Sequence, residues 1–397
     1  MTFRQGRISV IAASAAFSAW LALLSYPMIS DSYALYATCQ AIGMALFIVT
    51  VSLAYSGRLA ATAASMTRGQ MVTILIIYLS LALQLHDSEL DVLGGIFYTC
   101  LLPLMALTLS ALWTMPPADF ERCMTVTSVV LCLFGISAIA VYGWPEGRTI
   151  GGLLHPNLYS APLLAAFVFS QFRPGILGIV VRVLCFAMIA LVSSRYALVG
   201  CVVALLLHEM TFDPLGRTKI PVVVIALVAA VVFWPQISAI IALHDPDRGT
   251  TSGFTGRDDL WQLALETITD SPFGVGFKRA VGNEGGHNGY LKLLVEFGVP
   301  GGAVLILLLA CSIVAAGIDA CSNAAKSRQQ HRFDCARFGG MGALYFGAFF
   351  QPQIFSLGDA FAVSFMLLLF RPRPISRPTR DPIQQHGEHQ YGNVGAR

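Results

Sequence analysis

Charged residues are scarce in this sequence. Only 12% of its 397 residues are Asp, Glu, Lys or Arg, whereas 56% are hydrophobic and the mean hydropathy is +0.68. Soluble domains carry about 25% charged residues, and so little polar side chain cannot cover the surface of a water-soluble protein. The composition therefore excludes a disordered or collagen-like chain, disfavours a soluble enzyme, and predicts a polytopic membrane protein.

Closely spaced cysteine pairs are also missing. The nine cysteines form no CxxC pair and show no metal-ligand spacing. Most lie in apolar runs, where a free thiol behaves as a small hydrophobic side chain. On the outer face, the nearest approach to a metal-binding carboxylate pair is Asp245 with Asp247, which we interpret as loop residues. We therefore expect no disulfide framework, no metal site and no cofactor.

Twelve apolar runs of bilayer length can be marked along the chain. A helix needs roughly 20 apolar residues to cross the hydrocarbon, so we expect an all-α protein with about 12 transmembrane helices. The first run exceeds a signal-peptide core and lacks a small-residue cleavage site, so we expect it to remain; a cleaved signal followed by eleven helices is the alternative. The runs are 8–28, 33–55, 70–86, 92–114, 124–143, 157–172, 175–193, 196–210, 219–243, 290–318, 336–355 and 358–370.

Lysine and arginine are unevenly distributed between the loops. If the N-terminus is cytoplasmic and the crossings alternate, 18 of the 25 basic residues fall on the cytoplasmic side, as the positive-inside rule requires. This bias predicts an even number of spans with both termini in the cytoplasm. The basic residues left on the outer side are Arg148, Arg195, Arg248, Arg257, Lys278, Arg279 and Lys292.

The last residues differ in composition from the rest. Residues 371–397 are polar and proline-rich, which is typical of disorder. We therefore divide the chain into a transmembrane domain at 1–370 and a disordered cytoplasmic tail at 371–397.

One outer loop, roughly 244–289, is long enough to hold functional groups. Within it, apolar residues from Leu260 to Ile268 recur at helical spacing. Thr255 and Asp258 fit a capping box, and Ser271-Pro272 closes the segment. We expect a short amphipathic helix on the membrane surface. The free N–H groups of a helix start, together with Arg257, would suit a phosphate.

Two shorter outer segments also carry polar groups. Ser193-Ser194-Arg195 interrupts a hydrophobic stretch, and an arginine at a membrane edge needs water or an anion. Taken alone, Arg195 is better explained as a turn or snorkelling residue. His155-Pro156-Asn157 precedes a predicted span, where capping is the ordinary role of such residues and substrate contact is the alternative.

These residues resemble a known family, the O-antigen ligase and O-antigen polymerase superfamily of bacterial envelope glycosyltransferases. His287-Asn288, nine further residues and then Gly298-Val299-Pro300-Gly301 are similar to the family's HN-x9-GxxG pattern. The preceding stretch 256–277, GRDDLWQLALETITDSPFGVGF, is similar to its GR-x3-W and SP-x-GxG run. The HPN and SSR segments fall where such proteins carry comparable residues. The likeness covers most of the chain as topology and about 60 residues as motif.

The resemblance implies a C-class glycosyltransferase fold whose periplasmic loop carries the amphipathic helix. Such enzymes act at the periplasmic face of the bacterial inner membrane. They transfer a glycan from undecaprenyl diphosphate to an acceptor hydroxyl without a metal. The implied partners are a glycan or lipid A–core acceptor, the bilayer and other envelope polysaccharide assembly proteins, and no nucleic acid.

The resemblance also implies roles for individual residues. A loop histidine acts as general base in the family and arginines hold the diphosphate, which implies these roles for His287, Arg257 and Arg195. Each assignment has a structural alternative: helix capping, a lipid-headgroup contact, or a place in the aromatic belt. Further candidate substrate contacts are Asn288, Tyr290, Lys278, Arg279, His155 and Asn157.

Three classes of function remain open at this point. The enzyme would be a polymerase or a ligase, and the short outer loop slightly favours a polymerase. A transporter or flippase of lipid-linked glycan or another solute would share the predicted topology, but it usually shows internal repeats and charges at mid-depth, which this sequence lacks. A non-catalytic scaffold would not need His287.

Overall fold

The computed structural model describes most of the chain. The described residues are 2–23, 33–55, 66, 68–84, 92–146, 149–150, 155–212, 235, 238, 253–277, 287–322, 326–352, 354–355 and 359–372. The predicted span 219–243 apart from two residues, the parts 244–252 and 278–286 of the outer loop, and most of the tail lie outside them. The elements are α1 (Thr2–Leu23), α3 (Tyr33–Tyr55), α5 (Arg68–Gln84), α6 (Val92–Leu112), α7 (Pro117–Tyr142), β1 (Pro145–Glu146), β2 (Thr149–Ile150), α8 (Pro156–Ser170), α9 (Ile176–Leu191), α10 (Arg195–Phe212), α13 (Gly253–Asp270), α14 (Gly289–Cys321), α15 (Arg328–Ala348) and α16 (Ala360–Leu369).

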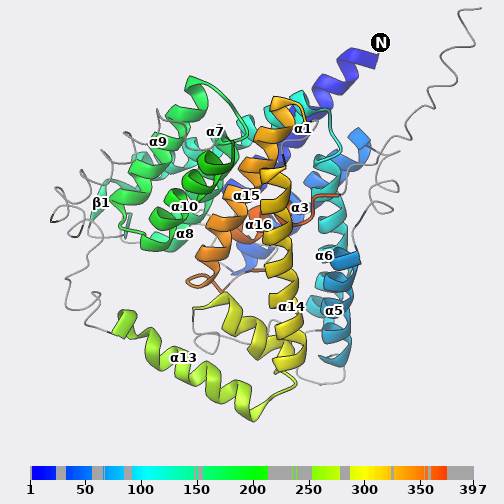
Figure 1. The fold of residues 1–397 in the computed structure, drawn as a ribbon, viewed down its shortest axis with the longest axis vertical. Helices are drawn as coiled ribbons and strands as arrows, with labels where there is room; N and C mark the ends of the chain where they lie inside the picture. The colour runs from blue at the N-terminus through cyan, green and yellow to red at the C-terminus, as the bar shows by residue number, and fades with distance from the viewer. Residues whose placement is uncertain are drawn as a thin grey trace, which may run out of the picture.

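The structure is a helical bundle, as the sequence predicts (Figure 1). Each of the other eleven predicted runs overlaps a helix, and the exception to the all-helical pattern is the small antiparallel pair β1–β2. Among the described residues, three helices are long and apolar enough to cross a membrane: α7, α10 and α14. The chain is a membrane protein, whereas its number of crossings and its orientation remain predictions.

The outer surface of α9 shows what surrounds this bundle. Ile176 is 81% exposed, Ile179 51% and Val183 61%, whereas Cys185 and Ile189 on the same helix are fully buried. Apolar side chains that face outward at spacings of three and four residues would be an aggregation hazard in water. In a membrane the same stripe contacts lipid.

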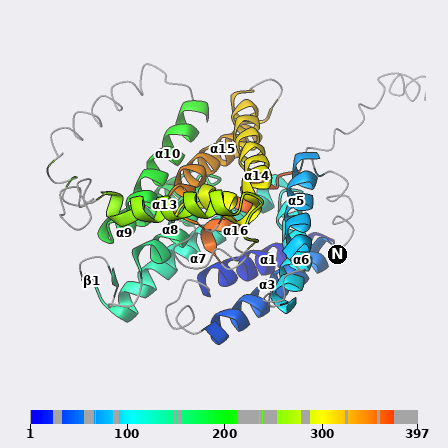
Figure 2. The same cartoon turned by 90° about the horizontal axis from the view of Figure 1, so that it is seen from below.

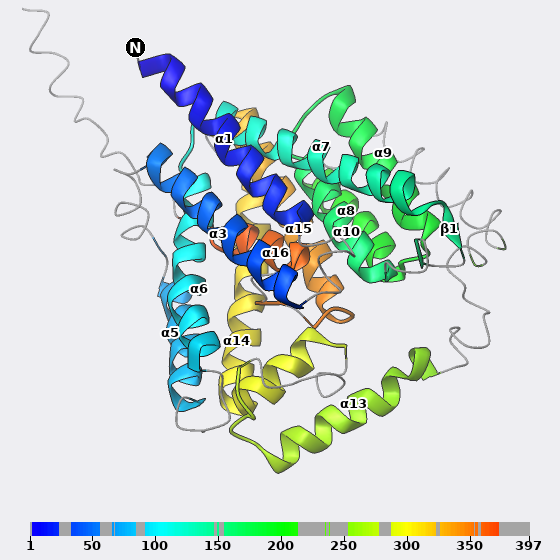
Figure 3. The same ribbon diagram turned by 180° about the vertical axis from the view of Figure 1, so that it is seen from behind.

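The centre of the bundle contains a helix too short to cross a membrane. All ten residues of α16 are buried, and at 1.5 Å per residue the helix is about 15 Å long, half of the hydrocarbon thickness. The expectation that 358–370 forms a full span is therefore wrong. A helix that is apolar on all sides becomes the core of the bundle instead, and Figure 3 shows α16 enclosed by its neighbours.

Helices α10 and α15 form the tightest pairing in the described bundle. Gly339 and Gly342 of α15 face α10, and a Cβ atom at either position would overlap Ala204 or Leu207. Small residues at an interface let two helix backbones approach closely. This packing holds α10, and with it Arg195 at the start of α10, against the core.

We predict that Gly339→Ala destabilises the protein by about 1–3 kcal/mol, the usual effect of overpacking. The added methyl group meets a backbone carbonyl oxygen, that of Ala204, which cannot rotate away. The measurement is the melting temperature in detergent. Gly301→Ala is the matched control, because its nearest neighbour is a side-chain atom of Phe297 at 3.2 Å. Equal melting temperatures for both variants would contradict this account of the packing.

Candidate functional site

Helix α14 bends at Gly298, and the bend receives the segment that follows α13. Gly298 has φ +70°, a conformation that glycine adopts without a steric penalty. The backbone N–H of Val275 donates to Val295 O at 2.9 Å, that of Gly276 to Glu296 O at 3.0 Å, and that of Val299 to Pro272 O at 2.8 Å. The SP-x-GxG and GxxG motifs are therefore two halves of one backbone contact.

The same contact fixes helix α13, which lies across one end of the bundle (Figure 2). Ala264 of α13 is fully buried against Val295, with Ile268 packed beside them. The expected helix is therefore present, and part of its apolar side packs against α14. The helix begins at Gly253. Thr255 therefore lies within its first turn, and the predicted cap at Thr255 is wrong. Arg257 stands in the following turn.

The turn before α10 is tied to the start of α8. Ser193 has φ +51°, a left-handed conformation that costs a residue with a side chain on the order of 1 kcal/mol. The buried hydroxyl of Ser194 accepts a hydrogen bond from Ser160 at 2.7 Å, and the Tyr196 hydroxyl donates to Asn157 O at 3.0 Å. These bonds hold the turn that carries Arg195.

His287 occupies a comparable turn before α14. It has φ +48° and, with Ser193, is one of two non-glycine residues in the described chain with positive φ. The Asn288 side chain caps α14 by accepting from the N–H groups of Tyr290 (2.9 Å) and Leu291 (3.2 Å). Asn288 therefore carries the capping role considered for this pair, and the His287 side chain is exposed.

The structure brings Arg195, Arg257 and His287 together. The positive charge of Arg195 acts on Arg257, and that of Arg257 acts on His287. The guanidinium of Arg257 also lies over the ring of Phe350, 5.2 Å from its centre, in a cation–π contact. The three residues come from α10, α13 and the turn before α14, so only the folded chain makes them neighbours.

Burial and the charges at this site lower the pKa of Arg257 and of His287. Burial and the charge of Arg195 lower the pKa of Arg257, and partial burial and the charge of Arg257 lower the pKa of His287 below its usual 6.5. His287 is therefore mainly neutral at neutral pH and able to accept a proton. Two guanidinium groups that repel each other would be stabilised by a bound anion.

Sequence reasoning missed the segment after α15. Phe350 lies under Arg257, and Gln351 is 7% exposed, with its carbonyl oxygen 2.7 Å from the place of a Cβ atom on Gly289. The side-chain Nε2 of Gln351 is buried and makes no hydrogen bond. The available signal was Gln351-Pro352-Gln353, a polar break inside the predicted span 336–355.

The other candidate contacts have mainly structural partners. The His155 side chain accepts from the Asn157 N–H at 3.2 Å and caps α8. The Tyr290 hydroxyl donates to Tyr345 O at 2.8 Å, and its ring packs on Phe349. Lys278 and Arg279 lie outside the described residues.

Lys292 and Glu296, four residues apart on α14, form an ion pair at 3.7 Å. Glu296 is only 3% exposed, so the pair is largely buried. The fold buries it because this turn of α14 is covered by the segment that follows α13.

One of two comparisons with known proteins found a match that includes this site. The family model described as O-antigen ligase matches residues 158–306. The match confirms the resemblance drawn from the motifs, and it includes Arg195, Arg257 and His287. No curated protein matches the chain.

We predict that Arg257→Gln raises the pKa of His287, because the charge that opposes protonation of the imidazole is removed. Arg257→Lys retains a positive charge and is expected to keep that pKa lowered. The measurement is a pH titration of the labelled histidine resonance in detergent, assigned with His287→Gln. An unchanged pKa in Arg257→Gln would show that the two groups do not interact.

We predict that Asn288→Ala lowers stability by about 1 kcal/mol through loss of the α14 cap. Asn288→Asp keeps an acceptor oxygen at the same place and should preserve the cap. Thermal melting of both variants in detergent is the measurement. If Asn288→Ala melts like the parent protein, the side chain does not act as the cap.

Proposed function

We propose that this chain transfers a glycan from undecaprenyl diphosphate to an acceptor sugar hydroxyl, because residues 158–306 match the O-antigen ligase family model. Glycan transfer between a lipid-linked donor and an acceptor in a membrane follows from the family. The donor, the catalytic residues and the absence of a metal requirement are our proposals. The observation that carries them is the convergence of Arg195, Arg257 and His287.

The two arginines are proposed to bind the diphosphate. A diphosphate bears charge on both phosphoryl groups, and guanidinium groups match its oxygen pairs with two parallel hydrogen bonds. The start of α10 adds the partial positive charge of a helix N-terminus. A diphosphate at this place would offset the repulsion between Arg195 and Arg257. The two guanidinium charges would in turn stabilise the negative charge that develops on the diphosphate as it leaves.

His287 is proposed as the general base. In the reaction the acceptor oxygen bonds to the anomeric carbon, its proton passes to His287, and the bond from that carbon to the diphosphate oxygen breaks with its electron pair on oxygen. One displacement inverts the anomeric configuration. The charge of Arg257 keeps the imidazole neutral and ready to accept the proton, and a base of this kind contributes about 10²–10⁴-fold to the rate.

The proposed site lies at the end of the bundle where α13 crosses and α14 begins. We assign this end to the periplasmic face of the bacterial inner membrane, since the lysines and arginines gather in the loops at the other side. The transmembrane domain would then be 1–370 with its catalytic loop at 244–289, and 371–397 would be a cytoplasmic tail. Within the described residues, no three His, Cys, Asp or Glu side chains group so as to hold a metal ion.

The test places the purified full chain in proteoliposomes with an oligosaccharide on undecaprenyl diphosphate, first without an added acceptor and then with lipid A–core. Mass spectrometry reads the glycan length on each lipid. A ladder of integer repeats identifies a polymerase, which the short outer loop favours. Transfer only to lipid A–core identifies a ligase.

His287→Ala is expected to reduce transfer by about 10²–10⁴-fold, and Arg195→Gln or Arg257→Gln by about 10²–10³-fold, as when one oxyanion donor is lost. Arg122→Gln, at an exposed arginine on α7, is the matched control and should retain activity. Transfer that persists in His287→Ala would reject the proposed base. Movement of the donor across the bilayer without any transfer would favour a flippase.

A further inference from the structure

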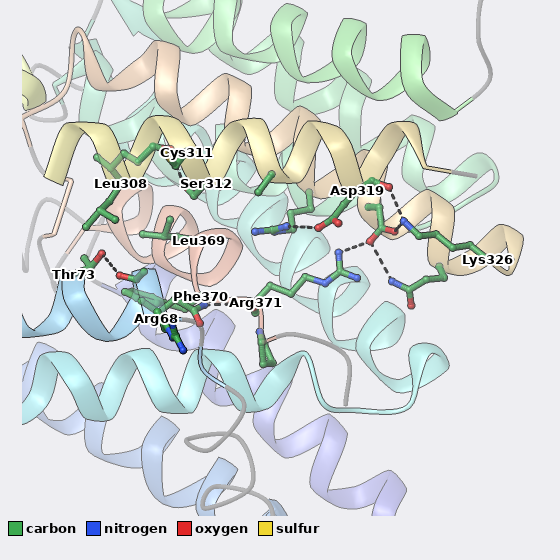
Figure 4. A pocket seen from close by; sticks show the side chains of 18 residues that line it. Arg68, Thr73, Leu308, Cys311, Ser312, Asp319, Lys326, Leu369, Phe370 and Arg371 are labelled. Carbon is green, nitrogen blue, oxygen red and sulfur yellow. Dashed lines mark hydrogen bonds and ion pairs between the residues drawn. The ribbon is translucent and has the colours of Figure 1, made fainter. Parts of the chain in front are cut away.

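A cavity of about 1060 Å³ lies along α14, away from the proposed active site (Figure 4). Its walls come from the start of α5, the second half of α14, the start of α15 and the end of α16. Ligand pockets in proteins are usually about 300–1,000 Å³, so this space is large enough for an organic molecule.

The lining of the cavity is mainly apolar at one end and charged at the other. Figure 4 shows Leu308 and Leu369 at the first end, with Arg68 below them, whereas Asp319, Lys326 and Arg371 lie toward the second. Residues 308 and 319 of α14 are about 16 Å apart along the helix at 1.5 Å per residue. Such a lining fits an elongated amphiphile better than a sugar or a nucleotide.

Positive charge is in excess among the lining residues. They include four cations, which are Arg68, Lys326, Arg337 and Arg371, and two carboxylates, which are Asp319 and Asp334. Asp334 pairs with Lys326 at 2.8 Å and with Arg371, and Asp319 pairs with Arg337 at 3.5 Å. The carboxylates thus hold three of the cations in place without cancelling the charge, which favours an anionic headgroup.

The charged end of the cavity also lies at a depth that suits a lipid headgroup. From the bend at Gly298 to Cys321, α14 rises about 35 Å, enough to cross the hydrocarbon. The charged end is therefore at the opposite end of α14 from Asn288. The helices beside the cavity present apolar side chains outward, with Leu75 of α5 54% exposed and Leu307 and Val314 of α14 63% and 61% exposed. Lipid chains that surround these helices are the nearest source of an occupant.

We propose that this cavity binds one anionic phospholipid of the cytoplasmic leaflet, with its phosphate beside Lys326 and Arg371 and an acyl chain along Leu308 and Leu369. Basic pockets between membrane helices on the cytoplasmic side recognise lipid phosphates in this way. The bound lipid would join α5 to α14, α15 and α16. The proposal needs only the membrane location of the chain and does not depend on glycan transfer.

The test is native mass spectrometry of the full chain, purified in detergent and incubated with phosphatidylglycerol or with phosphatidylcholine of the same acyl chains. One phosphatidylglycerol molecule should be retained in preference to phosphatidylcholine. Lys326→Gln should weaken its retention about fivefold, the contribution of one basic residue near an anionic lipid, and it leaves Asp334 paired with Arg371. Ala315→Phe, which places a ring at a lining position, should reduce occupancy through space alone.

Two matched controls separate the cavity from the general lipid surface. Arg122→Gln removes an exposed charge elsewhere, and Ala310→Phe adds a ring at an exposed position of α14 outside the cavity lining. Both should retain the lipid. Equal retention of the two lipids, or equal loss in all variants, would overturn the proposal. Protection against thermal unfolding by glycerol phosphate alone would replace it with a site for a soluble phosphate.

Discussion

The repulsion between Arg195 and Arg257 is the constraint around which this end of the molecule is built. Two half-buried guanidinium groups are held near each other although both carry positive charge. Each stands on a helix that is fixed elsewhere: α10 by close packing on α15, and α13 by the backbone contact with the bend of α14. The stability of the bundle thus offsets the electrostatic cost, as expected for a site prepared for an anion.

Helix α14 connects the two regions discussed above. Its capped beginning carries the turn of His287, its bend receives the segment after α13, and its second half forms a wall of the cavity with an excess of basic residues. Since the straight part is long enough to cross the hydrocarbon, a single helix links the proposed active site at one end of the bundle to the cavity beside its other end.

The positions of the helices depend on local sequence, whereas the lengths of some helices depend on contacts with distant parts of the chain. Helix positions followed from apolar runs, because a helix satisfies its own backbone groups in lipid. The lengths of some elements did not follow: 358–370 forms a ten-residue buried helix, and Gln351 leaves the predicted span 336–355 to lie beside Gly289. Hydropathy cannot distinguish apolar residues that contact lipid from those that contact other helices, because both are equally hydrophobic.

The sequence by itself determined that this is a helical membrane protein and which motifs it carries, since composition and the order of residues are local properties. His287, Arg257 and Arg195 could be named from those motifs. Only the tertiary structure decided that the three are neighbours, that Phe350 lies under Arg257, and that the motif glycines join α13 to α14. Contacts between residues far apart in the chain depend on how helices pack, and packing is set by the shape of many side chains together.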